Sequence, residues 1–211
     1  MLRFSLPRSL RGTAALVLLV GLVPALAAQS PAIELKKGDR IAFVGNTLAD
    51  RMQHDGWLET YLLSRFPKYD LVFRNLGFSG DDLAAQVRSQ TFRSQGFGSP
   101  TEWLTRTKTD VVFAFFGYGE SFAGEKGLEA FKRDLNNFLV DTKKQKYNGT
   151  SNARVVLFSP VAHENLKNPH LPDGSANNKR LEMYVKAMAE VAKANNVPFV
   201  DLFHPTLDAY A

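Results

Sequence analysis

Short apolar runs alternate along the chain with longer segments of helical periodicity, and this alternation predicts stacked βαβ units. The apolar runs predict five strands, at Arg40–Val44, Leu71–Arg74, Val111–Phe116, Val155–Ser159 and Phe199–Leu202. Apolar residues three and four positions apart predict helices around Leu58–Phe66, Leu128–Phe138 and Leu181–Val191, with a weaker helix from near Asp81 to about Gln90. The fold class is therefore expected to be α/β with a parallel sheet.

The first 27 residues have the layout of a secretory signal peptide. Arg3, Arg8 and Arg11 form a basic head, an apolar run follows at 14–23, and Ala25-Leu26-Ala27 is a small-x-small cleavage site. The apolar run is short for a membrane span, so we expect an exported protein, periplasmic or secreted, without a stable membrane anchor. Residues 28–39 would be a lead-in, and residues 40–211 a single domain.

Charge and composition exclude several function classes. Without the three leader arginines, 23 basic and 21 acidic residues remain, so the formal charge falls from +5 to +2. The short lysine runs lack interleaved aromatic residues, so we expect no nucleic-acid binding. The chain has no cysteine, which excludes disulfides, thiolate metal sites and cysteine nucleophiles. The sequence leaves the oligomeric state open.

A hydroxyl follows the first predicted strand directly. Gly45-Asn46 ends the strand, Thr47 comes next, and Asp50 stands three residues later. Thr-x-x-Asp at a helix start is a capping-box-like pattern, which taken alone favours a capping role for Thr47. However, the carboxyl end of a strand in an α/β sheet is also where ligands bind, so a nucleophile remains the alternative.

Glycine turns follow the second and third predicted strands. The second strand runs into Gly77-Phe78-Ser79-Gly80-Asp81, and the third into Gly117-Tyr118-Gly119-Glu120. Such turns leave backbone N–H groups uncovered that can hold an oxyanion, although most merely reverse the chain. As a dinucleotide fingerprint Gly117-x-Gly119 lacks the third glycine, so no cofactor is expected.

Together the three turns resemble the motif blocks of the SGNH or GDSL-type hydrolases, which are esterases. The resemblance spans about residues 38 to 203 and is nearest to SGNH-like domains of large exported planctomycete proteins, on the phrases at 46–52, 75–81 and 162–166. It implies a three-layer αβα flavodoxin-like fold, with a five-stranded parallel sheet in the order 2-1-3-4-5. It also implies a nucleophile at Thr47 and an oxyanion hole at Gly80 and at Gly119, where the family has asparagine. The candidate substrate-binding residues beside them are Asn46, Tyr118 and Glu120.

Two departures from the family weaken the catalytic inference. Thr47 carries a methyl group that crowds its hydroxyl and stiffens χ1, so attack is harder than for serine. Gly119 has no side-chain donor, and the loss of one oxyanion donor typically costs ~10²–10³ in rate.

The base is harder to place. Asp201 and His204 have the Asp-x-x-His spacing that such a hydrolase needs. Three strand spacings, however, would put the fifth strand about 14 Å from the first, and this distance argues against His204 as the base, with a loop histidine as the alternative. His163, which follows the fourth strand, is the other candidate for the base, with a loop-ordering histidine as the alternative. His163 and His170 are seven residues apart in a loop, which is no metal spacing, so no metal is expected.

Few residues follow the fifth predicted strand. A last helix would normally cover strands three to five on one face, and parallel sheets rarely leave a face bare. We therefore expect the C-terminal helix to be missing, with a further stretch of about 30 residues carrying that helix and the true base.

The leading hypothesis is an exported ester hydrolase that acts by acyl transfer on a small or carbohydrate ester. The alternative is a catalytically silent domain that binds a glycan or a protein partner in the same crevice.

Overall fold

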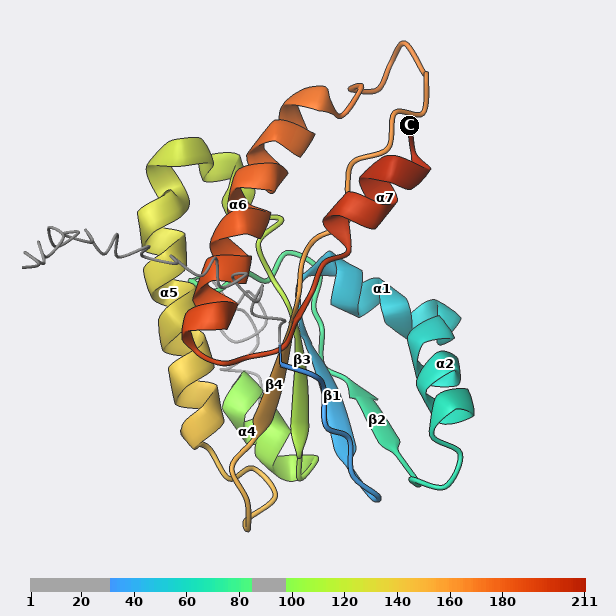
Figure 1. Ribbon diagram of the computed structural model, residues 1–211, viewed down its shortest axis with the longest axis vertical. Helices are drawn as coiled ribbons and strands as arrows, with labels where there is room; N and C mark the ends of the chain where they lie inside the picture. Colours follow the sequence, from blue (N-terminus) through green and yellow to red (C-terminus); the bar gives the residue numbers. More distant parts are fainter. Residues whose placement is uncertain (1–30, 85–97) are drawn as a thin grey trace, which may run out of the picture.

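A computed structural model describes residues 31–84 and 98–211 of the chain. Its centre is a parallel sheet of five strands in the order β2-β1-β3-β4-β5 (Figure 1). The strands are β1 (Arg40–Gly45), β2 (Val72–Asn75), β3 (Val111–Phe115), β4 (Arg154–Phe158) and β5 (Phe199–Val200). The α/β class and the strand order expected from the sequence are confirmed.

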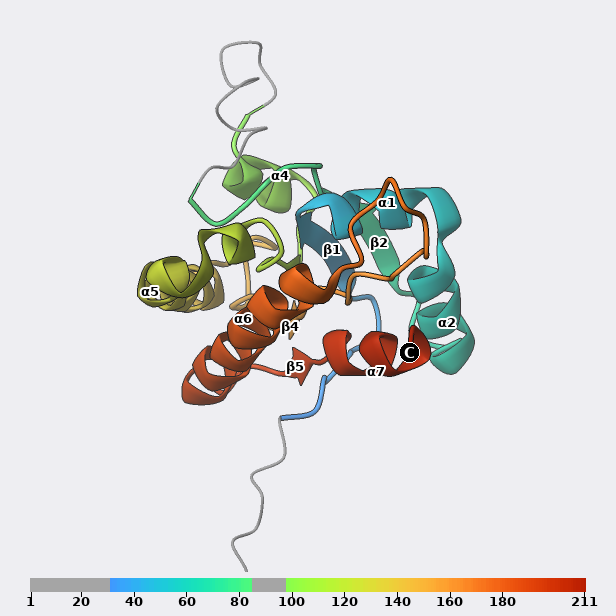
Figure 2. The ribbon, with the colours of Figure 1, turned by 90° about the horizontal axis from the view of Figure 1, so that it is seen from above.

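Helices cover both faces of the sheet (Figure 2). The helices are α1 (Thr47–Asp55), α2 (Trp57–Arg65), α4 (Pro100–Arg106), the 3-10 helix η2 (Glu120–Ala123), α5 (Gly124–Lys144), α6 (Ser175–Ala194) and α7 (Phe203–Ala209). Helices α4, α5 and α6 lie on one face, and α1, α2 and α7 on the other. The weak helix expected from Asp81 does not begin there, since residues 81–84 are not helical, and its remainder lies outside the described residues.

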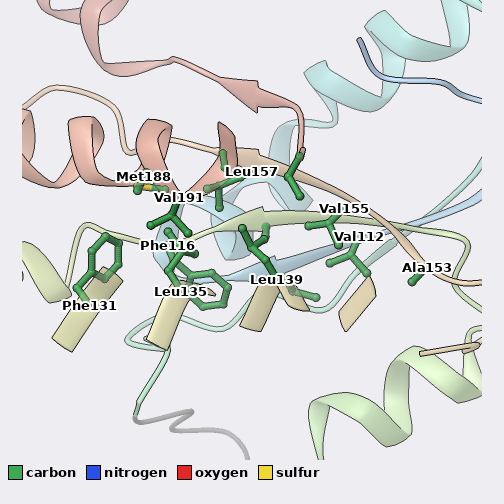
Figure 3. Close-up of a cluster of buried hydrophobic side chains, with 14 of the residues drawn as sticks. Val112, Phe116, Phe131, Leu135, Leu139, Ala153, Val155, Leu157, Met188 and Val191 are labelled. Carbon is green, nitrogen blue, oxygen red and sulfur yellow. The ribbon is translucent and has the colours of Figure 1, made fainter. Parts of the chain in front are cut away.

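Alternation along the strands divides the core into two layers. In β1, Ala42 and Val44 pack toward α5 and α6, whereas Ile41 and Phe43 pack toward α1 and α2. On the first side, every fourth residue of α5 (Phe131, Leu135 and Leu139) meets the sheet (Figure 3). The apolar stripe predicted over Leu128–Phe138 thus faces the sheet, where its side chains lose water-exposed apolar surface. In the stripe predicted over Leu58–Phe66, Leu62 is buried but Tyr61 is 61% exposed.

A short C-terminal helix exists where the sequence suggested that the last helix was missing. Helix α7 has seven residues and lies on the same face as α1 and α2 (Figure 2). On that face Phe113, Phe115 and Phe158 are at most 5% exposed. The stacked rings of Phe115 and Phe158, with centroids 4.5 Å apart, show how large aromatic residues close this layer. The argument that strands three to five would be uncovered within this chain is therefore wrong for β3 and β4, and Phe199 and Val200 of β5 are half-buried.

The register of the sheet brings the ends of three strands together. Gly45 at the end of β1 pairs with Phe115 at the end of β3, and Phe43 pairs with Asn75 at the end of β2. The turns that follow these strands therefore share one edge of the sheet. Among the described residues, none of the helices has the length and apolar character needed to cross a membrane.

Candidate active site

A cavity of about 490 Å³ opens at this edge of the sheet. Its lining includes residues from all three turns: Asn46, Thr47, Gly80, Tyr118 and Gly119. The structure therefore brings together most of the site residues expected from the sequence. Glu120, His163, Asp201 and His204 are not part of the lining.

The hydroxyl of Thr47 is not used to cap helix α1, because the side chain of Asn46 caps it. The N-cap of α1 is Asn46, whose side-chain oxygen accepts a hydrogen bond from the amide of Leu48 at 3.1 Å. The Thr47 side chain is exposed, and its hydroxyl has no hydrogen-bond partner in residues 31–84 and 98–211. The capping role that the pattern favoured for Thr47 is wrong, and the hydroxyl is available to a ligand in the cavity.

The carboxylate of Asp50 holds the second turn instead of completing a capping box. Asp50 accepts a hydrogen bond of 2.5 Å from the hydroxyl of Ser79. The turn lies directly on α1, since a Cβ on Gly77 would be 2.6 Å from the amide nitrogen of Asp50. The side chain of Asn75 adds a bond of 2.6 Å to the carbonyl of Ala49. These contacts fix the position of Gly80 relative to Thr47.

Gly45 allows β1 and β3 to approach closely at the cavity floor. Its φ is +123°, and a Cβ there would lie 2.0 Å from the carbonyl oxygen of Phe115. The same oxygen accepts a hydrogen bond from the amide of Asn46 at 3.0 Å. Only glycine fits at this position, and it directs the chain from β1 into the residue that precedes α1.

Glu120 links the second and third turns. Its two carboxylate oxygens accept hydrogen bonds from the amides of Leu83 at 3.1 Å and Gly117 at 2.9 Å. Burial raises the pKa of the Glu120 carboxyl above its usual range, and the backbone hydrogen bonds oppose that rise. The Glu120 carboxylate thus binds the backbone amides of Leu83 and Gly117 and is not part of the cavity lining.

Gly119 leaves open space in the cavity wall. Its backbone has ordinary right-handed helical angles, φ −60° and ψ −45°, and a Cβ there would meet no atom within 4 Å. At the position where the family has an asparagine donor, this chain therefore has no side chain, although a Cβ would fit there.

His163 is held by the first turns of α6. Its Nδ1 lies 2.8 Å from Nδ2 of Asn177, and its amide donates to Oδ1 of Asn178 at 2.8 Å. The carbonyl of His163 accepts from the same Asn178 side chain at 3.0 Å. These bonds match the loop-ordering alternative for His163.

Asp201 and His204 form a close pair after β5. Nδ1 of His204 lies 2.5 Å from a carboxylate oxygen of Asp201, and Nε2 lies 3.2 Å from a carboxylate oxygen of Glu182 on α6. The hydrogen bond to Asp201 raises the pKa of His204 above 6.5, and Glu182 adds to that effect. The imidazole is therefore oriented by Asp201 at one nitrogen and by Glu182 at the other.

Ser159 brings this segment to the cavity wall. Ser159 lines the cavity at the end of β4, and its Oγ accepts hydrogen bonds from the amides of Leu202 at 2.8 Å and Phe203 at 3.0 Å. The chain thus turns back toward the cavity immediately after β5. A count of strand spacings could not show this turn. Ser159 and Arg51, which also lines the cavity, are positions that sequence reasoning missed.

Within the two described stretches of chain, no group of three or more His, Cys, Asp or Glu side chains is placed to hold a metal ion.

The fold and the cavity define an α/β protein of the SGNH-like type. A profile of the GDSL-like Lipase/Acylhydrolase family matches residues 38–211, and the chain belongs to this family. A search of curated protein sequences finds no match.

Solved structures share the fold at low sequence identity. A gut microbial diltiazem-metabolizing enzyme superimposes with a TM-score of 0.64 at 18% identity, over 85% of this chain and 40% of that one. The chain therefore spans less than half of that enzyme's length. An acetyl-xylooligosaccharide esterase from Geobacillus stearothermophilus gives 0.60 at 14% identity, over 84% and 82% of the two chains. An acetyl xylan esterase gives 0.54 at 16% identity, over 80% of each chain.

Proposed function

We propose that the domain hydrolyses esters of small molecules or carbohydrates by acyl transfer in the cavity described above. The observation that carries this proposal is the Thr47 hydroxyl, which lines the cavity beside Gly80 and is released from helix capping by Asn46. Family membership supports it. The acetyl esterases that share the fold support a carbohydrate ester as one class of substrate.

In this mechanism Thr47 Oγ1 attacks the carbonyl carbon of the ester. The amides of Thr47 and Gly80 donate to the oxyanion, and neither of them has an acceptor among the described residues. The alcohol then leaves with a proton, and water hydrolyses the acyl-enzyme.

The Asp201–His204 pair is the base that we propose for both steps. Asp201 fixes the tautomer of the imidazole through Nδ1, as a triad aspartate does. In the Geobacillus esterase, two catalytic mutants replace an aspartate and a histidine that are three positions apart, which is the spacing of Asp201 and His204. For the reaction, Nε2 has to leave Glu182 and face Thr47.

Hydrolysis of p-nitrophenyl acetate by the purified protein and by a Thr47→Ala variant tests the proposal. We expect Thr47→Ala to lower kcat/KM by at least about 10²-fold, since the nucleophile is lost. A Thr47→Ser variant is the matched control, because it keeps the hydroxyl and removes only the crowding methyl group. Equal rates for the protein and Thr47→Ala would refute a threonine nucleophile.

The second candidate function is a catalytically silent domain that binds a glycan or a protein in the same cavity. Two observations favour it: Gly119 offers no side-chain donor, and Glu182 occupies Nε2 of His204. Saturable binding of an unesterified oligosaccharide by a protein without esterase activity would establish this alternative.

We also propose that the protein is exported and that it is related to the SGNH-like domains of planctomycete proteins. The layout of residues 1–27 supports export, and the phrases at 46–52, 75–81 and 162–166 support the kinship. Amino-terminal sequencing of protein recovered outside the cytoplasm should give Ala28 as the first residue. Recovery with Met1 intact would contradict cleavage.

A further inference from the structure

Two exposed aromatic side chains lie next to each other beside the cavity, and one of them, Tyr118, is part of its lining. Tyr118 lines the cavity and is 37% exposed, and Phe122 on η2 is 59% exposed. Their ring centroids are 5.7 Å apart and their planes meet at 77°. Large aromatic residues normally bury most of their surface, so this pair forms an apolar step at the mouth of the site.

The step is held in place by contacts with its neighbours in the chain and on α6. The hydroxyl of buried Ser121 donates a hydrogen bond of 2.7 Å to the carbonyl of Tyr118. The guanidinium of Arg180 lies over the ring of Phe122 at 5.5 Å, and Arg180 also donates to the side chain of Asn177. Helix η2 packs against α5 and α6. The rings are thus preorganised, which lowers the entropy cost of binding a ligand there.

Gly119 keeps this step open. It lies between Tyr118 and Phe122 in the chain, and no side chain fills the space beside it. Thr47, Gly119 and Tyr118 line the same cavity, and Gly119 contributes no side chain to it. A ligand with its ester carbonyl at Thr47 would extend its alcohol portion over the aromatic step.

We propose that Tyr118, Phe122 and Arg180 form a subsite for the sugar ring of an acylated saccharide. This inference rests on the proposed function and names the substrate class of the same site. The C–H face of a pyranose matches an exposed aromatic face, and guanidinium N–H groups match sugar hydroxyls. A long acyl chain would instead need an enclosed apolar channel, whereas this step is open to solvent.

Binding is measured first, in a Thr47→Ala background that prevents turnover. Acetylated xylotriose and unmodified xylotriose are titrated into the full chain and followed by calorimetry. We expect both to bind, and Phe122→Ala and Tyr118→Ala each to weaken binding about 3- to 10-fold through the loss of one ring contact. Trp57→Ala removes an aromatic that is 79% exposed on α2, outside the cavity lining, and is the matched control with unchanged affinity.

Kinetics then separate the subsite from the esterase proposal. With Thr47 present, Phe122→Ala should raise KM about 3- to 10-fold more for acetylated xylotriose than for glycerol triacetate, which has no ring. Sugar binding that depends on Phe122 without any hydrolysis would sustain the subsite and refute the esterase. No sugar binding, equal effects of Phe122→Ala and Trp57→Ala, or a larger KM effect on long-chain acyl esters would overturn the subsite.

Discussion

Restoring a side-chain donor at position 119 should accelerate ester hydrolysis. Gly119 lines the cavity with Thr47, and its φ of −60° and ψ of −45° suit any L-residue. A Cβ there meets nothing within 4 Å, so the first side-chain atom of Gly119→Asn enters without a clash. One oxyanion donor is worth about 2.7–4 kcal/mol, or ~10²–10³ in kcat. We expect kcat for p-nitrophenyl acetate to rise toward the lower end of that range.

Stability should change little and in the favourable direction. Replacing glycine where the backbone is compatible adds about 0.4–1 kcal/mol, because the unfolded chain loses freedom. Gly119→Ala is the matched control, since it has the same backbone effect and no donor. The Thr47→Ala/Gly119→Asn double variant must lose the gain. If Gly119→Ala is as fast as Gly119→Asn, or if the gain survives without Thr47, the oxyanion reasoning is refuted.

Three further predictions follow from the site's geometry. Gly45→Ala should lower the free energy of unfolding in urea by about 3 kcal/mol or more, because its Cβ overlaps the Phe115 carbonyl. Gly149→Ala, where φ is +83° and the space is open, should lower it by only about 1–2 kcal/mol. Equal costs for the two variants would contradict the overlap. Because burial raises the pKa of Glu120 above 4.5, its folded form binds protons more tightly, so the free energy of unfolding should fall as pH rises from 4.5 through the raised value. Glu120→Gln should remove that decline in the free energy of unfolding. If the pH profile of the variant equals that of the parent, Glu120 is not the cause of the decline. Asp201→Asn should lower the NMR-determined pKa of His204 toward 6.5. The stability that protonated His204 contributes below pH 6.5 should then be lost at a lower pH than in the parent. If the pKa does not change, Glu182 and not Asp201 is the principal partner of His204.

Hydrophobic periodicity predicted most of the fold because each strand or helix carries the pattern of its own buried face in its local sequence. Strand β1, for example, is apolar on both faces, as a strand buried between two helical layers must be. The closed aromatic layer was not predictable in this way. Whether Phe113 and Phe158 are covered depends on residues from α1, α2 and the segment before α7, which no local pattern reports.

The site was predictable to the level of its turns. Asn46 and Thr47 are both good N-cap residues, and the sequence alone could not decide which of them caps α1. The bond from Ser79 to Asp50 and the bond from Leu83 to Glu120 join residues 29 and 37 positions apart. Such contacts depend on how the turns pack together, so propensity and spacing carry no signal for them.

Because Asn46 caps α1, the side chain of Thr47 is not needed to cap that helix. A substitution at 47 leaves the helix start intact, and one at 119 enters open space. Activity can therefore be lost from this scaffold and regained by single substitutions, without an unstable intermediate that selection would remove. On the proposed mechanism, a hydrolase and a silent binding protein built on this cavity differ by single substitutions at 47 or 119, and the rest of the cavity lining is shared by both.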